Sequence, residues 1–419
     1  MKLNPLFYII SIFFLVSCSK EENEMNNTND PNNPDLNTPR IEITFDNQIL
    51  NSFNAFDIIK IIKKNDGFIF FTNELITEFP FNTGIRISKI DNQLNLVWTF
   101  IINESTEKDH LAGVLEVEND EYISILSKMN YSNIGLGNYE VYGLKFNNSG
   151  NILWIKNYSA NNVDQNIHLD EAIDFTNKST ELKIMFRSDS TFQNSEDFYF
   201  REVKINSDGD ILSNIKLNYT NVNNFYNIIY DKLGNKYNFG GKRVVDFYVG
   251  NTAFTSYDAS IMKYNLNNNM VFDKLYGIPR IDDYFNRILI DNNNKANFIG
   301  KYGIDYSNDT EARWIVQMDD SGNILWEIKE YEEQFKYYGK DIIQDDDGNY
   351  LSLFNDVNGY NLATLIKSNN QGEILWKFVD GAKGNNDSFS PYKVLKNNEE
   401  YLIFGLKEYK IWLKKIIVE

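Results

Sequence analysis

The chain is poor in residues that bind metals or form disulfides, with one cysteine and two histidines among 419 residues. Because a disulfide needs two cysteines, none can form within the chain. A cysteine-based metal site is excluded and a histidine-rich one nearly so, since such sites use three or four ligands. Neither His110 nor His168 lies in zincin spacing. We therefore expect no metal and no cofactor.

Signatures of catalysis are equally scarce. The sequence contains no Gly-x-Ser-x-Gly elbow and no glycine-rich phosphate loop, and its single cysteine lies near the N-terminus. Nucleophilic catalysis therefore has no support. Paired carboxylates for glycoside chemistry stay possible, because the chain holds 59 Asp and Glu residues whose separations a sequence does not reveal. A non-enzymatic protein is the favoured interpretation.

Positive charge is in deficit, with 41 Lys and Arg and a net charge of -18. A surface this acidic repels phosphate backbones, so we expect no nucleic-acid partner. The most acidic turn, Asp345-Asp346-Asp347-Gly348, resembles a calcium loop only at a glance. Tyr350 stands where an EF-hand requires glycine, so a solvated hairpin turn is the better interpretation.

Long hydrophobic runs are absent except at the N-terminus, where residues 5–16 are mostly apolar and follow Lys2. The run is too short to span a bilayer and matches a secretory signal. It ends in Leu15-Val16-Ser17-Cys18, which resembles a bacterial lipobox. The resemblance implies that residues 1–17 are a signal peptide and that a lipidated Cys18 anchors the mature chain to a membrane.

The residues after Cys18 also resemble a sorting signal. Lys20, Glu21 and Glu22 resemble the lipoprotein export signal of Bacteroidota, which implies an outer-membrane protein that faces the cell exterior. Residues 23–40 are rich in Asn, Pro, Asp and Thr and have almost no apolar side chain. They cannot bury enough surface to offset the entropy of ordering, so we expect residues 18–40 to form a disordered tether.

From residue 41 onward, short alternating apolar runs are separated by Asn, Asp and Gly turns, which predicts strands and hairpins. The string Asp-Ser-Gly-Asn-Ile-Leu-Trp at residues 320–326 recurs in related forms. Aligned positions lie 50 to 59 residues apart, at Trp98, Trp154, Ser213, Phe272, Trp326 and Trp376. This period fits a four-stranded propeller blade.

Six such units run from about residue 54 to about residue 383, and a seventh, from about residue 388, lacks a fourth strand. The segment Ile41-Glu42-Ile43-Thr44-Phe45 precedes the first unit and is otherwise unpartnered. An unpaired strand edge is a liability that closure removes. The sequence therefore predicts an all-β, seven-bladed β-propeller over residues 41–419, closed by this N-terminal strand.

The units resemble the secreted propeller repeats of Bacteroidota, whose signature is Lys-Leu-Asp-x-Asp-Gly-Asn-x-x-Trp. The fourth unit resembles the seven-bladed repeat called SBBP in Gly240-Gly241, Asp246-Phe247, Gly250 and residues 255–265. The resemblance implies the fold and supplies no catalytic residue. It is degenerate, because Ser213 and Phe272 replace the Trp.

Aromatic or histidine residues recur just before the first strand of several units. Loops held by a rigid scaffold concentrate binding residues, and the connections at this end are long. We therefore predict a ligand site at the mouth of the central channel. Its expected members are His110, His168, Tyr226, Tyr284 and Tyr338. Packing between blades is the competing interpretation.

The favoured function is a surface-anchored, non-enzymatic propeller that binds a glycan or a protein partner at the cell envelope. Two alternatives stay open. One is a polysaccharide lyase or hydrolase that uses carboxylates on the rim, and the other is a scaffold or outer-membrane assembly lipoprotein.

Overall fold

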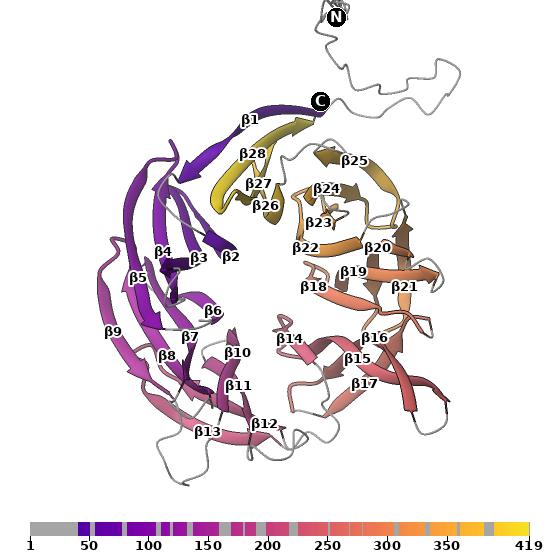
Figure 1. The fold of residues 1–419 in the computed structure, drawn as a ribbon, viewed down its shortest axis with the longest axis horizontal. Coiled ribbons are helices and arrows are strands. Elements are labelled where there is room, and N and C mark those ends of the chain that lie inside the picture. Colours follow the sequence, from indigo (N-terminus) through magenta and orange to yellow (C-terminus); the bar gives the residue numbers. More distant parts are fainter. Residues whose placement is uncertain are drawn as a thin grey trace, which may run out of the picture. The chain divides into compact units, whose positions relative to one another are not determined.

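The fold of the described residues consists of strands, with no helix among them (Figure 1). A computed structural model describes residues 41–50, 55–77, 82–105, 110–117, 120–131, 137–158, 169–178, 181–189, 198–217, 225–249, 252–267, 269–278, 280–305, 310–331, 336–357, 361–380 and 389–418. Cys18, Lys20, Glu21, Glu22 and His168 lie outside these residues. No helix in the described part is long and apolar enough to cross a membrane.

The strands form seven antiparallel sheets of four, which we call blades. Blade 1 contains β2 (Ala55–Lys64), β3 (Gly67–Thr77), β4 (Asn82–Asp91) and β5 (Leu96–Ser105). Blade 2 contains β6 (His110–Val117), β7 (Glu121–Tyr131), β8 (Gly137–Asn147) and β9 (Ile152–Asn157). Blade 3 contains β10 (Leu169–Lys178), β11 (Glu181–Asp189), β12 (Phe198–Ile205) and β13 (Ile211–Leu217).

Blade 4 contains β14 (Phe225–Tyr230), β15 (Lys236–Val249), β16 (Thr252–Tyr264) and β17 (Met270–Tyr276). Blade 5 contains β18 (Tyr284–Ile290), β19 (Ala296–Asp305), β20 (Thr310–Met318) and β21 (Ile324–Glu330). Blade 6 contains β22 (Lys336–Gln344), β23 (Tyr350–Val357), β24 (Asn361–Ser368) and β25 (Ile374–Asp380). Blade 7 contains β26 (Ser390–Asn397), β27 (Glu400–Lys407), β28 (Lys410–Val418) and the N-terminal β1 (Ile41–Leu50).

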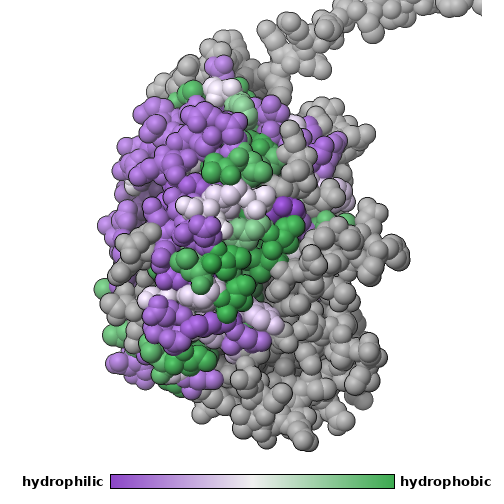
Figure 2. Space-filling view, turned by 90° about the vertical axis from the view of Figure 1, so that its left-hand side faces the viewer, coloured by the Kyte–Doolittle hydropathy of each residue, from purple (hydrophilic) through white to green (hydrophobic). Residues whose placement is uncertain are grey.

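The first strand of each blade lies nearest a common centre and the fourth lies outermost (Figure 1). Turns between first and second strands and between third and fourth strands share one end of the blades, which we call the turn end. The opposite loop end carries the other connections. The outer strands leave aliphatic side chains exposed, among them Leu96, Val97, Ile152, Leu153, Ile211 and Leu212. Figure 2 shows hydrophobic patches among hydrophilic surface on the left-hand side of the molecule in Figure 1.

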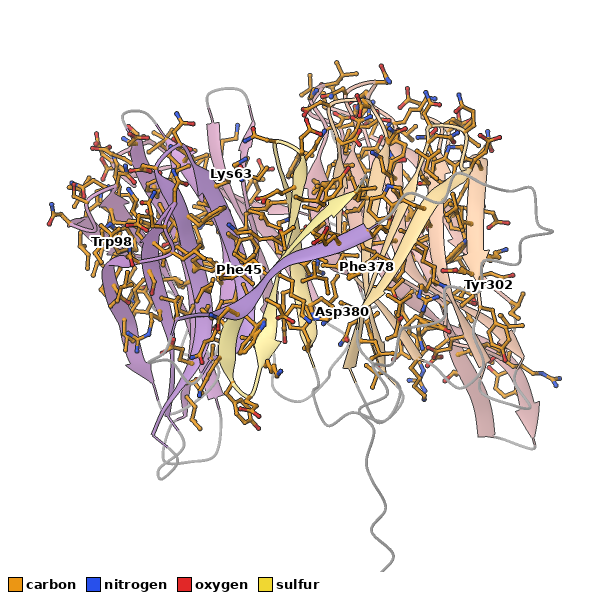
Figure 3. All side chains as sticks on the ribbon, turned by 90° about the horizontal axis from the view of Figure 1, so that it is seen from above. Phe45, Lys63, Trp98, Tyr302, Phe378 and Asp380 are labelled. Atoms are coloured by element: carbon orange, nitrogen blue, oxygen red, sulfur yellow. The ribbon has the colours of Figure 1, made fainter. Side chains whose placement is uncertain are left out.

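The predicted pairing of the N-terminal strand is confirmed. β1 runs antiparallel to β28, with Ile41 opposite Val418 and Phe45 opposite Lys415. Phe45 lies where the first and last blades meet (Figure 3), and one buried cluster joins Ile49 and Leu50 of β1 to side chains of both blades. That this pairing closes the ring stays a prediction.

The turns repeat one hydrogen-bond pattern, which explains their Asn, Asp and Gly content. Asp319 Oδ1 accepts from the backbone N–H groups of Ser321 and Asn323, both at 2.8 Å. Asp345 Oδ1 accepts in the same way from Asp347 and Asn349, which makes the acidic stretch a hairpin turn. Side chains of this kind stabilise turns by bonding their own backbone.

The core lies between blades, because each buried cluster combines side chains of two neighbouring sheets. At the turn end, an aromatic side chain of one blade lies over the turn glycine of the next. A Cβ on Gly150 would be 2.8 Å from the Trp98 ring, and one on Gly372 would be 2.8 Å from the Trp326 ring. Trp326 Nε1 also donates to the Asn370 carbonyl at 3.0 Å. The repeating Trp is therefore a packing residue.

We predict that deleting residues 1–50 will destabilise the propeller far more than deleting residues 1–38. The longer deletion removes β1, exposes the edge of β28 and loses the burial of Ile49 and Leu50. At about 1.5–3 kcal/mol for each buried aliphatic side chain, the free energy of unfolding should fall by at least about 3 kcal/mol. Thermal and urea unfolding measure this, and equal stability of the two deletions would refute the structural role of β1.

Candidate functional site

Every first strand carries a β-bulge at the same place, near the loop end. Each bulge leaves one residue of the first strand without a partner on the second strand. Bulges re-aim side chains and are common beside functional sites. The residues that these seven bulges leave unpaired are Phe56, Ala112, Ile173, Tyr226, Asn286, Lys340 and Tyr392. β2 has a second bulge at Ile59.

The bulges give the predicted residues a common position. Three of them stand two positions before the bulge residue of their strand, namely His110, Tyr284 and Tyr338. Tyr226 is itself a bulge residue. The structure describes the backbone of His110 and Tyr226 but not their side chains. The prediction that these residues bind a ligand therefore rests on position, and only Tyr284 and Tyr338 can be examined as side chains.

Tyr284 contacts its neighbours on one side and solvent on the other. Its half-buried ring stacks on Tyr257 of blade 4, with ring centroids 5.5 Å apart and planes at 30°. Gly241 makes room for it, since a Cβ there would be 2.4 Å from Cε1 of Tyr284. The Lys301 ammonium lies 5.3 Å from the ring centroid. Tyr338 is more open, with 42% of its surface exposed.

Charged side chains from four blades also meet near the bulges, which the sequence analysis missed. Lys340 Nζ lies 4.8 Å from the centroid of the Tyr392 ring. Burial lowers the pKa of the Lys340 ammonium, the positive charge of Arg287 lowers it further, and the Asp57 carboxylate opposes both. Burial raises the pKa of Tyr392 to about 12, and the charge of Asp57 acts in the same direction.

Hydrogen bonds at the bulges connect adjacent blades. The Gly339 N–H of blade 6 donates to Asn286 Oδ1 of blade 5 at 3.3 Å. Asp341 Oδ2 accepts from the Val394 N–H of blade 7 at 3.0 Å, and its Oδ1 pairs with Lys393 Nζ at 2.6 Å. The first strands of blades 5, 6 and 7 are thus held in register, which fixes the positions of Lys340, Arg287 and their neighbours. We call these bulged strands and their side chains the central site.

A buried carboxyl group lies in the segment that links blades 4 and 5. Asp283 is fully buried and accepts from the backbone N–H groups of Gly303 at 2.7 Å and Ile278 at 3.1 Å. Burial raises the pKa of Asp283 to about 7, against the pull of these two hydrogen bonds, and the charge of Asp258 raises it further. Because no surface of Asp283 is exposed, its role is to hold the linker.

Asp258 is the nearest candidate for a carboxylate on the rim. It is half-buried, its Oδ1 has no hydrogen-bond partner, and both burial and the charge of Asp246 raise its pKa. Asp246 itself accepts from Ser256 Oγ and from the Arg280 N–H. Within the described residues, no group of three or more His, Cys, Asp or Glu side chains could hold a metal ion.

The seven four-stranded antiparallel sheets and their order define a seven-bladed β-propeller. No model of a known protein family matches the chain, and no curated protein matches it in sequence. Solved structures do match. A polysaccharide lyase, the ulvan lyase of family PL25 bound to -[GlcA(1-4)Rha3S]-, is 14% identical with a TM-score of 0.53, over 90% of this chain and 96% of that chain.

Raptor from Chaetomium thermophilum is 8% identical with a TM-score of 0.54, over 91% of this chain but only 30% of that chain. At such identities, the likeness to both proteins shows the fold alone. A polysaccharide lyase and Raptor share this fold, so the fold alone does not assign a function.

We predict that Asp283→Asn will flatten the dependence of stability on pH. A carboxyl group with a raised pKa binds its proton more tightly in the folded state, so stability falls as pH rises from about 4 to about 7. With the folded pKa about 7, that fall amounts to about 4 kcal/mol at most. Between pH 5 and pH 8, the melting temperature of the variant should fall by less than that of the wild type.

The adjacent Asp282→Asn is the control, because Asp282 also accepts one backbone N–H, that of Tyr257. If the melting temperatures of wild type and Asp283→Asn fall equally between the two pH values, the buried carboxyl does not titrate as described.

Proposed function

We propose that this protein is a non-enzymatic binding propeller of the cell envelope, and that its central site holds a glycan or a protein segment. The observation that carries the proposal is the set of seven equivalent bulges. They gather aromatic and charged side chains from several blades, including Tyr338, Lys340, Arg287 and Tyr392, around one centre. Aromatic faces beside polar groups suit sugars and peptides alike.

The chemistry of these side chains supports binding more than turnover. Asp283 is enclosed and bonded to backbone N–H groups, so it offers no accessible acid. Lys340 stands beside Tyr392 and the positive charge of Arg287, and this arrangement attracts an anionic or aromatic ligand group. Cleavage by a carboxylate pair remains the alternative function, and Asp258 and Asp246 would be its first candidates.

The N-terminal features supply the proposed location. Cys18 as the lipidated residue, with Lys20, Glu21 and Glu22 as the export signal, would place the protein on the outer membrane facing the exterior. β1 begins at the turn end with Ile41, opposite Val418. The expected tether, residues 18–40, would therefore join the propeller at the turn end of blade 7.

We predict that Cys18→Ala will abolish membrane retention. Without the thiol the chain cannot be lipidated, so the protein should appear in the soluble fraction or keep its signal peptide. Fractionation of cells and intact-mass measurement of the purified protein test this. Unchanged membrane retention together with unchanged mass would rule out the anchor, and Ser17→Ala serves as the matched control.

We predict that Tyr338→Ala will weaken ligand binding at least five-fold with little change in melting temperature. Its ring is 42% exposed, so its removal costs contact area for a ligand but little packing. A pull-down from intact cells and a panel of polysaccharides would identify the ligand. Titration then measures affinity, and assays for released sugar ends report any cleavage.

Tyr248→Ala is the matched control, because this tyrosine is 67% exposed and lies near the tip of the β15–β16 hairpin. Equal binding by wild type and Tyr338→Ala would exclude the central site. A large loss of stability in Tyr338→Ala would instead show that the ring serves packing between blades.

A further inference from the structure

At the junction between blade 7 and blade 1, Phe45 of β1 stands opposite Lys415, the place that Trp98 takes opposite Lys89 and Trp376 takes opposite Lys367. β1 is the outer strand of blade 7, and its sequence, IEITFDNQIL, contains no Trp. In the facing turn of blade 1, Leu94 stands where Gly150 and Gly372 stand in their blades, and its φ is 69°. Non-glycine residues rarely adopt this conformation, and leucine even less than Asn or Asp. The repeat is therefore altered on both sides of the same junction.

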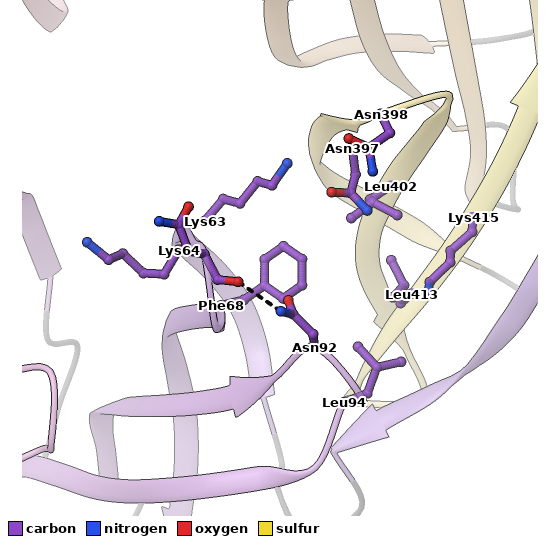
Figure 4. Close-up of a pocket in the computed structure, with 11 residues that line it drawn as sticks. Lys63, Lys64, Phe68, Asn92, Leu94, Asn397, Asn398, Leu402, Leu413 and Lys415 are labelled. Carbon is purple, nitrogen blue, oxygen red and sulfur yellow. Dashed lines mark hydrogen bonds between the residues drawn. The ribbon is translucent and has the colours of Figure 1, made fainter.

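A pocket of about 510 Å³ opens at this junction (Figure 4). Its inner part is apolar and includes Phe68, Leu94, Leu402 and Leu413. Its remaining lining is polar and contains Lys63, Lys415, Asn65, Asn92, Asn397 and Asn398. The volume falls in the range of roughly 300–1,000 Å³ that is usual for small-molecule sites.

Lys415 occupies a lysine position that recurs in the third strands. Its partner on the second strand is Leu402, as the partner of Lys367 is Leu351 in blade 6. In other blades the lysine at this position pairs with a carboxylate of a nearby turn. The pairs are Lys89 with Asp66 at 2.7 Å, Lys263 with Asp320 at 2.7 Å, and Lys367 with Asp345 at 2.8 Å.

In the part of the chain that the structure describes, no turn carboxylate takes this role for Lys415. Asn92 stands in the blade 1 turn where Asp320 stands in the blade 5 turn. Glu399, in the turn of blade 7, makes no ion pair with Lys415. The Lys415 ammonium lies instead 5.3 Å from the centroid of the Phe45 ring. Among the described residues, no carboxylate pairs with this lysine.

Lys63 adds a second ammonium group to the pocket. Its Nζ donates to the Lys396 backbone carbonyl at 3.1 Å and has no carboxylate partner within the described ranges. Lys64 also lines the pocket, but its Nζ pairs with Glu116 at 2.6 Å and Asp120 at 2.8 Å. Two positive charges in an otherwise acidic protein are therefore left for a ligand.

We propose that this pocket binds a negatively charged sugar, whose carboxylate or sulfate group pairs with Lys415 and Lys63. The anion would take the place that a turn aspartate fills beside the equivalent lysines. Asn side chains both donate and accept hydrogen bonds, which suits sugar hydroxyl groups. Asn92 is already held at the wall, because its Nδ2 donates to the Asn65 carbonyl at 2.9 Å (Figure 4). The apolar inner surface suits the C–H face of a sugar ring.

The test is calorimetric titration of the full-length protein at low salt with three probes of matched length. The probes are an oligogalacturonate, a sulfated galactan oligosaccharide and a neutral galactan oligosaccharide. At least one acidic probe should bind, and the neutral probe should bind at least ten-fold more weakly. Whichever acidic probe binds identifies the anion, and affinity should fall as salt is added.

Two variants locate the site. Lys415→Gln should weaken binding of the acidic probe at least ten-fold. The control is Lys410→Gln, at the opposite end of the same strand, which should leave the affinity for this probe unchanged. Asn92→Asp places a carboxylate where Asp320 stands in the blade 5 turn and should also abolish binding, because it neutralises Lys415 internally. Melting temperatures establish that each variant is folded.

The proposal is overturned if neither acidic probe binds, if the neutral probe binds equally well, or if folded Lys415→Gln and Asn92→Asp both keep wild-type affinity. The pocket lies at the turn end, and the central site lies at the other end of the first strands. Tyr338→Ala should therefore leave the acidic probe unaffected, so this inference and the proposed function can fail separately.

Discussion

The contact on which the propeller depends is an aromatic side chain lying over the turn glycine of the next blade. The turn needs a positive φ, which is 82° at Gly150 and 85° at Gly372. A Cβ at either position would also collide with the Trp ring above it. One residue thus meets two demands, a left-handed backbone and a flat surface for the neighbouring blade. The Trp and the Gly are therefore coupled across blades.

This coupling explains the departures from the repeat. Phe272 replaces the Trp but still lies over Gly322, so that junction keeps both partners. Where Ser213 replaces the Trp, the turn that follows at residues 266–269 contains no Gly. Where β1 supplies Phe45 in place of the Trp, Leu94 replaces the Gly. At these two junctions the turn glycine and the Trp of the preceding blade thus change together.

Much of the architecture could be predicted from the sequence because it rests on local signals. The turn residues and the period of the Trp positions indicated the blades, and the orphan segment at Ile41 indicated the partner of β28. The bulges were not predicted, because the shift that they cause in the alternation falls on residues such as Gly339 and Asp341 of β22, which are buried without being apolar. The fold alone brings three charges together that are far apart in the sequence. They belong to Asp57 of blade 1, Arg287 of blade 5 and Lys340 of blade 6.

The pocket between blades 1 and 7 shows why a repeat is informative where it breaks. Lys415 keeps the lysine position of the third strands, and Phe45 stands opposite it as Trp98 stands opposite Lys89 in blade 1. Its ammonium group nevertheless pairs with no carboxylate of the described residues. Lys63, on the wall of the same pocket, also has no carboxylate partner there. A lysine that keeps its place in the repeat without the ion pair of its equivalents, beside a second such lysine, is explained more economically by an anionic ligand than by packing alone.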